Sequence, residues 1–267
     1  IIGAGISGLF IANLFKKNTN YQIAVFEKNN SINLEEGYGI QLSVNSVKLL
    51  NKIEFNRFQN NKKYHPGKIN FYSNNISNKI CHLNISDFNN EYCKYTTLKR
   101  SELINFLKKD LGEKIKTDHD ISKIDQKNQL IRLTFANNQT YECDYLIISD
   151  GVFSKSKNLI SNTKIQPRYN NTLAIRGMIS NSSNVDYKNI SLFLGSDFHH
   201  VIYPVSSEKD LNFIAIMKYN LSKEEQTNYK LFSDDNFIKK ILEKVPKEIS
   251  EFIGEIKELK IFPVFVS

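Results

Sequence analysis

The sequence predicts a mixed α/β fold of the α+β kind, in which a nucleotide-binding half is followed by a sheet-rich half. Two observations lead to this prediction. A glycine-rich turn opens the chain and runs into a helical pattern, whereas long strand-like segments follow after about Ile165. The 267 residues are enough for one large or two smaller domains with a substantial core.

The first element is the glycine-rich turn in "IIGAGISGLF". Gly3, Gly5 and Gly8 fit the pattern G-x-G-x-x-G, which allows a tight turn, close approach of backbone to a pyrophosphate, and close packing of a helix on a strand. Only two residues precede Gly3 where a strand is expected, so we expect the natural chain to begin a few residues earlier. A helical period over residues 6–17 indicates that the turn opens a helix.

The second element is "YQIAVFEKN", which has the pattern of a buried strand that ends on Glu27. Glu27 lies 19 residues after Gly8, close to the spacing of roughly 20 at which a βαβ unit places an acid on a ribose. The alternative is an ordinary βαβ unit with a glutamate on its surface.

The elements that follow alternate between helix and strand. "GYGIQLSVNSVKLLNKI" predicts a loop and then a helix capped by Ser43 or Asn45, and "KINFYSN" and "KICHLNI" predict two strands. "LKRSELINFLKKDLG" predicts an amphipathic helix with Ser101 as its cap and Gly112 as its stop. Three further strands are expected in "DISKID", "QLIRLTF" and "QTYECDYLIIS".

The second half of the chain predicts an antiparallel sheet. Its strands are expected in "TLAIRGMIS", "ISLFLGS", "HHVIYPVS" and "LNFIAIMKY", followed by a helix in "DDNFIKKILEKVP" and by "ELKIFPVFVS". We therefore expect a discontinuous nucleotide-binding domain over residues 1–63 and 93–164. A sheet domain is expected over residues 64–92 and 165–267, with a substrate cleft between the two domains.

Composition argues against several classes of protein. The formal charge of +8 is carried mainly by scattered lysines, which indicates a solvated surface; a nucleic-acid site would cluster arginine and lysine with aromatic residues. No apolar run is long enough for a membrane span, and no signal peptide is apparent. Cys81, Cys93 and Cys143 form no C-x-x-C pair, so neither a zinc site nor a disulfide framework is expected, and a reducing, cytoplasmic location suits them.

Several linked motifs give the chain a family resemblance over essentially its whole length. "IIGAGISGL", "VFEK", "GYGIQLSVNSVKLL", "LKRSELINFL", "DYLIISDGVFSKSKN" and "HHVIYPV" occur in the order found in class A flavoprotein monooxygenases. The sequence most resembles the salicylate hydroxylase and 3-hydroxybenzoate 6-hydroxylase group. This resemblance implies a Rossmann-like FAD-binding domain of the GR2 or p-hydroxybenzoate hydroxylase-like type and an antiparallel-sheet substrate domain.

The resemblance also implies an activity. Such an enzyme uses FAD, with NADH or NADPH as co-substrate, and hydroxylates a phenolic or other aromatic substrate with O2 through a flavin C4a-hydroperoxide. A ubiquinone-pathway hydroxylase, an isoprenoid reductase-like flavoprotein and a non-catalytic FAD-binding module are the alternatives. The expected partners are thus a small aromatic substrate, O2 and NAD(P)H, without nucleic acid, a metal or an integral membrane segment.

Carried over position by position, the resemblance assigns the cofactor-binding residues. Gly3, Gly5 and Gly8 would receive the FAD pyrophosphate and Glu27 the adenosine ribose. The other residues assigned to the cofactor are Lys28, Gln41 near the flavin, Arg100 directed at the FAD, and Asp150 with Gly151 in a D-G motif near the pyrophosphate and the nicotinamide path. The alternatives are a surface arginine at a helix end, an ordinary D-G turn, and a polar loop residue at Gln41.

The chain departs from the family pattern at three points. Lys157 stands where the D-G segment usually ends in arginine, and lysine lacks bidentate geometry, which brings the affinity for a nicotinamide cofactor into question. Ser149 stands where alanine is usual. The third FAD motif, a Gly-Asp pair that opens a helix, does not occur in these residues, so we expect a longer enzyme that is truncated here at its C-terminus.

The candidate catalytic residues lie in "HHVIYPV". Strand alternation places His199, Val201 and Tyr203 on one face and His200 and Ile202 on the other. A phenol titrates near 10 and a histidine near 6.5, so a histidine is a suitable proton acceptor where the site favours phenolate. The resemblance assigns His199 as this base and Tyr203 as a substrate contact.

Other interpretations of these strands stay open. The histidine pair could be a hydrogen-bonded strand edge, and a zinc site is disfavoured because no third ligand lies nearby. Arg176 has the geometry to pair with a substrate carboxylate, although a strand-surface role is the favoured interpretation.

Overall fold

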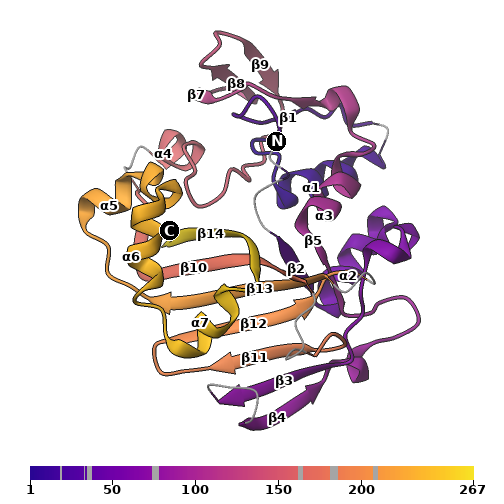
Figure 1. Cartoon of the computed structure of the whole chain (residues 1–267). Coiled ribbons are helices and arrows are strands. Elements are labelled where there is room, and N and C mark those ends of the chain that lie inside the picture. Colours follow the sequence, from indigo (N-terminus) through magenta and orange to yellow (C-terminus); the bar gives the residue numbers. More distant parts are fainter. Residues whose placement is uncertain are drawn as a thin grey trace.

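The computed structural model (Figure 1) describes residues 1–18, 20–32, 34, 38–73, 78–161, 165–180, 186–206 and 210–267. In this view the glycine-rich turn and helices α1 (Ile6–Lys16) and α3 (Arg100–Lys108) lie above a seven-stranded sheet. The predicted α+β fold class is therefore confirmed. No helix in the described part of the chain has the length and apolar character needed to cross a membrane.

The part of the chain that carries the glycine-rich turn, which we call the glycine-turn part (residues 1–63 and 93–161), is built on very short parallel pairings. Helix α1 (Ile6–Lys16) follows the turn, and β1 (Val25–Phe26) pairs in parallel with β6 (Ile115–Lys116). Ile2 bridges both Phe26 and Ile148 in parallel. The strand expected over "YQIAVFEKN" is therefore shorter than predicted. The strand expected over "QTYECDYLIIS" is formed only in its first part, as β9 (Thr140–Cys143), and at the single bridge of Ile148 to Ile2.

Two helices and a two-stranded ribbon complete the middle of this part. β2 (Gly39–Leu42) pairs antiparallel with β5 (Thr96–Lys99), and each leads into a helix, α2 (Val44–Leu50) or α3 (Arg100–Lys108). Ser43 caps α2, since its hydroxyl accepts a hydrogen bond from Ser46 N at 3.4 Å. The prediction that Ser101 caps α3 is wrong, because the helix already includes Arg100 and its cap position is Lys99.

The remaining elements of this part form a three-stranded sheet, one face of which is buried through Leu133 and Phe135, and a short helix. The sheet has the order β7-β8-β9 and is antiparallel. Its strands are β7 (Ile121–Lys127), β8 (Leu130–Phe135) and β9 (Thr140–Cys143), and helix α4 (Ser156–Ser161) follows.

The large sheet has the strand order β14-β10-β13-β12-β11-β3-β4. All neighbours are antiparallel except β11 and β3, which run in parallel. Its strands are β3 (Lys68–Ser73), β4 (Lys79–Asn84), β10 (Arg168–Ser180), β11 (Ile190–Leu194), β12 (Phe198–Pro204), β13 (Asp210–Lys218) and β14 (Ile256–Val266).

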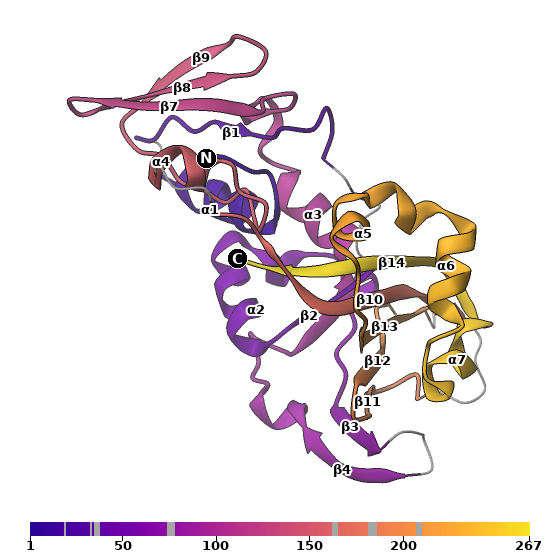
Figure 2. The same ribbon diagram turned by 90° about the vertical axis from the view of Figure 1, so that its left-hand side faces the viewer.

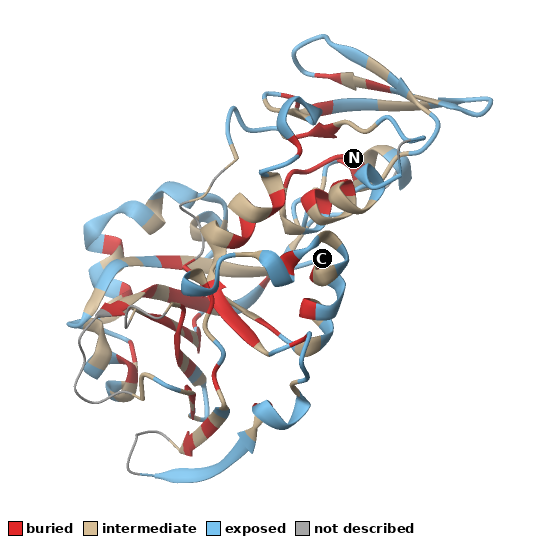
Figure 3. Cartoon of the chain, turned by 90° about the vertical axis from the view of Figure 1, so that its right-hand side faces the viewer, coloured by how far each residue is buried: buried red, intermediate tan, exposed pale blue. Residues whose placement is uncertain are grey.

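The two faces of this sheet have different partners (Figure 2). Helices α5 (Lys223–Thr227), α6 (Asp235–Leu242) and α7 (Lys247–Ile253) lie on one face, and β2 and α2 lie on the opposite side. Alternate strand residues such as Ile175, Phe193 and Phe213 are fully buried against Phe237 and Ile241 of α6. Figure 3 shows this concentration of buried residues in the sheet and the exposure of the edge strand β4.

His200 lies in this helix-covered core, opposite in direction to His199. It is fully buried, its ring stacks on Phe193 with centroids 4.3 Å apart, and neither ring nitrogen has a hydrogen-bond partner among the described residues. Burial, and secondarily the neighbouring His199, lowers the pKa of His200 from 6.5 to about 4. The imidazole is therefore neutral in the folded protein at neutral pH.

This burial predicts a pH-dependent stability. Below pH 6.5 the unfolded imidazole takes up a proton before the folded one does, so the free energy of unfolding falls as the pH drops toward 4, by about 3 kcal/mol from this group. The His200→Phe variant is expected to lack this slope, as measured by urea unfolding between pH 7 and pH 4. His82→Phe, at an exposed position of β4, is the control. An unchanged slope in His200→Phe would contradict the assignment.

Candidate functional site

The glycine turn leaves an open space in front of α1. Gly3 has a φ of +96°, and a Cβ there would lie 2.5 Å from the Ser149 carbonyl oxygen. A Cβ on Gly8 would lie 2.0 Å from the Gly3 carbonyl oxygen, whereas a Cβ on Gly5 would meet no atom within 4 Å. Gly3 and Gly8 are thus required by packing, and Gly5 borders the space at a helix N-terminus where an anionic group can approach the backbone.

The carboxylate of Glu27 is fixed beside this turn. Its Oε2 accepts a hydrogen bond from Ala4 N at 3.0 Å, and its Oε1 accepts one from Asn29 N at 3.1 Å. Each carboxylate oxygen has a second lone pair, so Glu27 retains acceptor capacity for ligand hydroxyl groups. Its position at the end of β1 agrees with the spacing argument from the sequence.

The D-G segment reaches the turn from a distant part of the chain. Ser149 Oγ donates to the Ile2 carbonyl at 2.9 Å, which ties the segment to the turn. Asp150 Oδ2 accepts from Ser156 N at 3.2 Å, while its Oδ1 is buried and has no hydrogen-bond partner among the described residues. Gly151 has a φ of +79°, where a side chain would be strained. A buried acceptor without a donor suits a ligand hydroxyl group.

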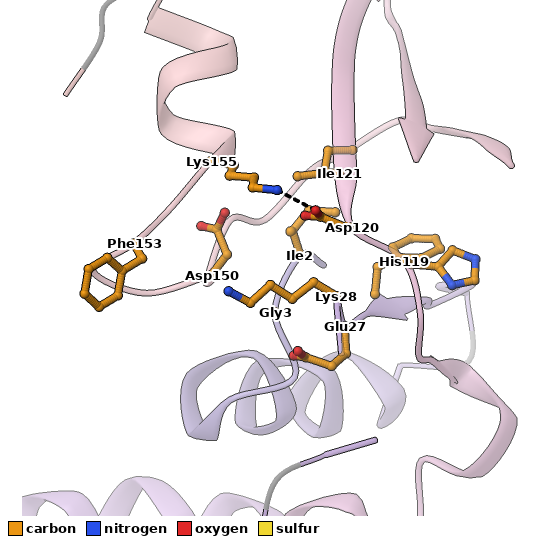
Figure 4. Close-up of a pocket in the computed structure, with 11 residues that line it drawn as sticks. Ile2, Gly3, Glu27, Lys28, His119, Asp120, Ile121, Asp150, Phe153 and Lys155 are labelled. Atoms are coloured by element: carbon orange, nitrogen blue, oxygen red, sulfur yellow. Dashed lines mark hydrogen bonds and ion pairs between the residues drawn. The ribbon is translucent and has the colours of Figure 1, made fainter. Parts of the chain in front are cut away.

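One pocket brings four of the predicted cofactor residues together (Figure 4). Gly3, Glu27, Lys28 and Asp150 line it. The other predicted cofactor residues lie outside this lining: Gly5, Gly8, Gln41, Arg100 and Gly151. The full lining is Ile2, Gly3, Phe26, Glu27, Lys28, His119, Asp120, Ile121, Asp150, Phe153 and Lys155.

Sequence reasoning missed the lining contributed by the segment after β6. The parallel pairing of β1 with β6 brings the residues that follow both strands to the same sheet edge, and His119 N donates to the Glu27 carbonyl at 2.8 Å. Asp120 forms an ion pair with Lys155 across the pocket. Lys155, and not Lys157, is therefore the D-G segment lysine that lines the pocket. Recognising β6 as the next parallel strand would have pointed to this edge.

Gln41 lies on the β2–β5 ribbon, which crosses toward the large sheet, and Arg100 directly follows the end of β5. Gly39 N donates to Asn212 Oδ1 of β13 at 2.7 Å, and Thr97 Oγ1 donates to the Pro204 carbonyl. Gln41 Oε1 accepts a hydrogen bond from Tyr95 OH at 2.7 Å. The ribbon therefore places Gln41 between the glycine-turn part and the sheet, whereas Arg100 begins α3, and its backbone N donates to the Tyr38 carbonyl at 3.0 Å.

His199 and Tyr203 lie on the sheet face that the ribbon approaches. Their cross-strand partners are Ile216 and Asn212, two residues of β13 that share this face. His199 is exposed, whereas Tyr203 is buried beside the ribbon. Their Cα atoms are about 13 Å apart along the strand, from four residues at strand spacing. The two residues thus share one face of the sheet, but His199 lies near the exposed start of β12 and Tyr203 near its buried end.

The chemistry of the tyrosine follows from its burial. Burial raises the pKa of Tyr203 far above its ordinary value, and the Arg176 cation and a hydrogen bond from Gln41 only partly oppose this effect. Tyr203 therefore stays protonated and acts as a neutral hydrogen-bonding group, not as a base.

The described structure thus joins a Rossmann-like part, which carries the glycine turn and the pocket, to a large sheet. A family model described as the NAD(P)-binding Rossmann-like domain matches residues 1–34. The chain is 24% identical over 222 residues to a 3-amino-4-hydroxybenzoate 2-monooxygenase from Streptomyces cremeus, with 81% of this chain and 55% of the relative covered. It is 22% identical over 234 residues to a salicylate hydroxylase from Pseudomonas putida, with 80% and 53% covered.

The chain spans about half the length of these curated relatives. Among solved structures, Klebsiella pneumoniae HpxO complexed with FAD and uric acid superposes with a TM-score of 0.82 at 15% identity, covering 99% of this chain and 67% of that one. These findings confirm the resemblance to the class A FAD-dependent aromatic monooxygenases that the motifs indicated.

Proposed function

We propose that this chain is the FAD-binding and substrate-binding part of a monooxygenase that hydroxylates a phenolic or heteroaromatic acid with NAD(P)H and O2. The observation that carries the proposal is that one chain joins a dinucleotide pocket to a sheet face bearing His199 and Tyr203, with Gln41 between them. The names of the relatives support the substrate class, since two of them act on 3-amino-4-hydroxybenzoate and salicylate.

The pocket fits the FAD that the resemblance implies. The open space at Gly5 suits the pyrophosphate, Glu27 has acceptor capacity for the ribose hydroxyls, and the unpartnered Asp150 Oδ1 suits another ligand hydroxyl. Lys28 adds positive charge to the lining, whereas the charge of Lys155 is balanced by Asp120. FAD, when bound, supplies electron transfer from NAD(P)H and the activation of O2.

The chain's own residues would prepare the substrate ring for this chemistry. His199 would accept the phenol proton, which makes the ring more electron-rich, and its exposure lets the proton pass on to solvent. Tyr203 and Gln41 would form the polar end of the site. An apolar surface against which a ring would pack lies between His199 and this polar end. It consists of half-buried Val201, Ile214 and Leu192.

The two parts of the chain would bind different ligands, and the protein would act in the cytoplasm. Residues 1–63 and 93–164 would bind FAD, and residues 64–92 and 165–267 would bind the substrate. The membership of β3 and β4 in the large sheet supports this division. A cytoplasmic location is supported by Cys81, Cys93 and Cys143, which are all free.

The test is turnover by the full-length protein loaded with FAD. NADH and NADPH oxidation would be followed with a panel of hydroxybenzoates and hydroxynicotinates, together with hydroxylated product and hydrogen peroxide. We expect one class of acid to stimulate oxidation with product formed in proportion to the cofactor consumed. Bound flavin without stimulated oxidation would overturn the proposal in favour of an isoprenoid or quinone-pathway substrate, or of a non-catalytic FAD-binding module.

A further inference from the structure

We infer that Arg176 of β10 anchors the anionic group of the substrate and so determines that the enzyme acts on aromatic acids. This inference rests on the proposed function and assigns a specificity-determining role to one residue. The sequence favoured a surface role for this arginine, and the structure supplies the arguments against that role.

The position of Arg176 places it on the candidate substrate face. Arg176 is directly opposite Ile214 of β13, and Ile214 is directly opposite Val201 of β12, so the three residues share one row across the sheet. His199 lies two residues from Val201 on the same face. Strand spacing puts the Cα atoms of Arg176 and His199 about 12 Å apart, which leaves room for a single ring between the two side chains.

Arg176 makes no direct ion pair with any described residue. It is half-buried, and no hydrogen bond of its side chain occurs within the described ranges. Arg176 acts electrostatically on the hydroxyl groups of Tyr38 and Tyr203, and the Glu258 carboxylate acts on the Tyr38 hydroxyl as well. Burial raises the pKa of both tyrosines, so both stay neutral and cannot balance the cation.

The neighbouring strand adds a second positive charge. Lys260 of β14 is the cross-strand partner of Arg176. Like charges directly opposite each other on a sheet are destabilising, and a partly desolvated cation without a partner costs free energy. An anion bound beside Arg176 and Lys260 would offset both the repulsion between the two cations and the cost of the unpaired charge. A planar carboxylate matches the two-pronged geometry of the guanidinium group.

The backbone around Arg176 is held in a defined place. A Cβ on the next residue, Gly177, would lie 2.0 Å from Ile256 Cγ2, so β14 packs directly on this glycine. The pairing of β10 with β14 is irregular between Arg176 and Met178, where Glu258 has a φ of +55°. This tight, irregular contact fixes the backbone of β10 at Arg176 and thus the direction in which the Arg176 side chain leaves the strand. A solvated arginine on the surface would not need such a fixed backbone.

The experiment compares acids with their neutral amides. Binding of salicylate and salicylamide, and of 3-hydroxybenzoate and 3-hydroxybenzamide, would be measured by calorimetry on the full-length FAD-loaded protein without NAD(P)H. We expect tighter binding of the acid than of its amide. Arg176→Gln should weaken binding of the acid by roughly 10- to 100-fold, which is the contribution of a charge-assisted hydrogen bond to affinity. The affinity for the amide should not change. Arg176→Lys should restore part of the acid preference.

The control is Arg168→Gln, which removes the same charge from an exposed position at the start of the same strand. It should change neither acid nor amide binding. A wild-type protein that binds acid and amide equally, or binds neither, overturns the inference, as does an equal loss of both in Arg176→Gln. Acid-selective binding that depends on Arg176 in a protein that hydroxylates nothing would support the anchor and contradict the proposed function.

Discussion

The Gly5→Val variant is expected to fold normally and to lose FAD binding. Gly5 has extended backbone angles, φ −76° and ψ −177°, that any residue adopts, and a Cβ there meets no atom within 4 Å. The free energy of unfolding should therefore change by no more than about 1 kcal/mol. The new side chain would occupy the space where a pyrophosphate contacts backbone N–H groups, so the affinity for FAD should fall at least roughly 100-fold.

Flavin fluorescence titration and thermal unfolding of the same samples measure the two effects separately. Gly254→Val is the matched control, because Gly254 also has open space around it but follows α7 on the far side of the sheet. Gly8→Ala should instead destabilise the protein, since its Cβ would lie 2.0 Å from a backbone oxygen. If Gly5→Val binds FAD as the wild type does, the turn does not hold the pyrophosphate.

The His199→Ala variant is expected to lose hydroxylation while it keeps its fold and its flavin. His199 is exposed, so its removal leaves no cavity, and it lies outside the lining of the dinucleotide pocket. A positioned general base contributes roughly 10²- to 10⁴-fold to rate. We expect a fall of this size in product formation at neutral pH, measured with the acid that best stimulates NAD(P)H oxidation.

The control for this variant is His82→Ala, which removes an exposed imidazole from the edge strand β4. It should leave product formation unchanged. A second variant, His199→Gln, keeps a polar side chain of similar size but cannot accept a proton at neutral pH, and it should be as slow as His199→Ala. Full activity in both His199 variants would place the base elsewhere, with Tyr203 excluded because its burial keeps it protonated.

Local patterns predicted the helices and strands well where each element obeys its own periodicity. The alternation in "HHVIYPV" predicted opposite directions for His199 and His200, and the exposed and fully buried positions of the two rings agree with it. The weaker predictions lie at element ends. Ser101 has the chemistry of a cap, but the partner of β2 continues to Lys99, so the helix begins before the serine.

Some residues of the candidate site could be predicted from local sequence, and others could not. The glycine turn and Glu27 are close in sequence, and their spacing was enough to bring them together. His119, Asp120 and Lys155 reach the pocket through the pairing of β1 with β6 and the D-G segment, and nothing local in their sequence indicates this meeting. The cofactor roles of all the residues assigned from the sequence stay predictions, and Gln41 of the ribbon and Arg100 of α3 also lie outside the pocket lining.

The sequence by itself determined the class of fold, the glycine turn and the two faces of the strand that carries His199, because these depend on backbone conformation and on periods of two or three to four residues. Only the tertiary structure decided which face of the sheet is covered by helices, which residues beyond Glu27 line the pocket, and that Arg176 stands without a carboxylate partner in the described chain. These features depend on contacts between residues far apart in the sequence, whose pairing is set by sheet register and packing and not by local pattern.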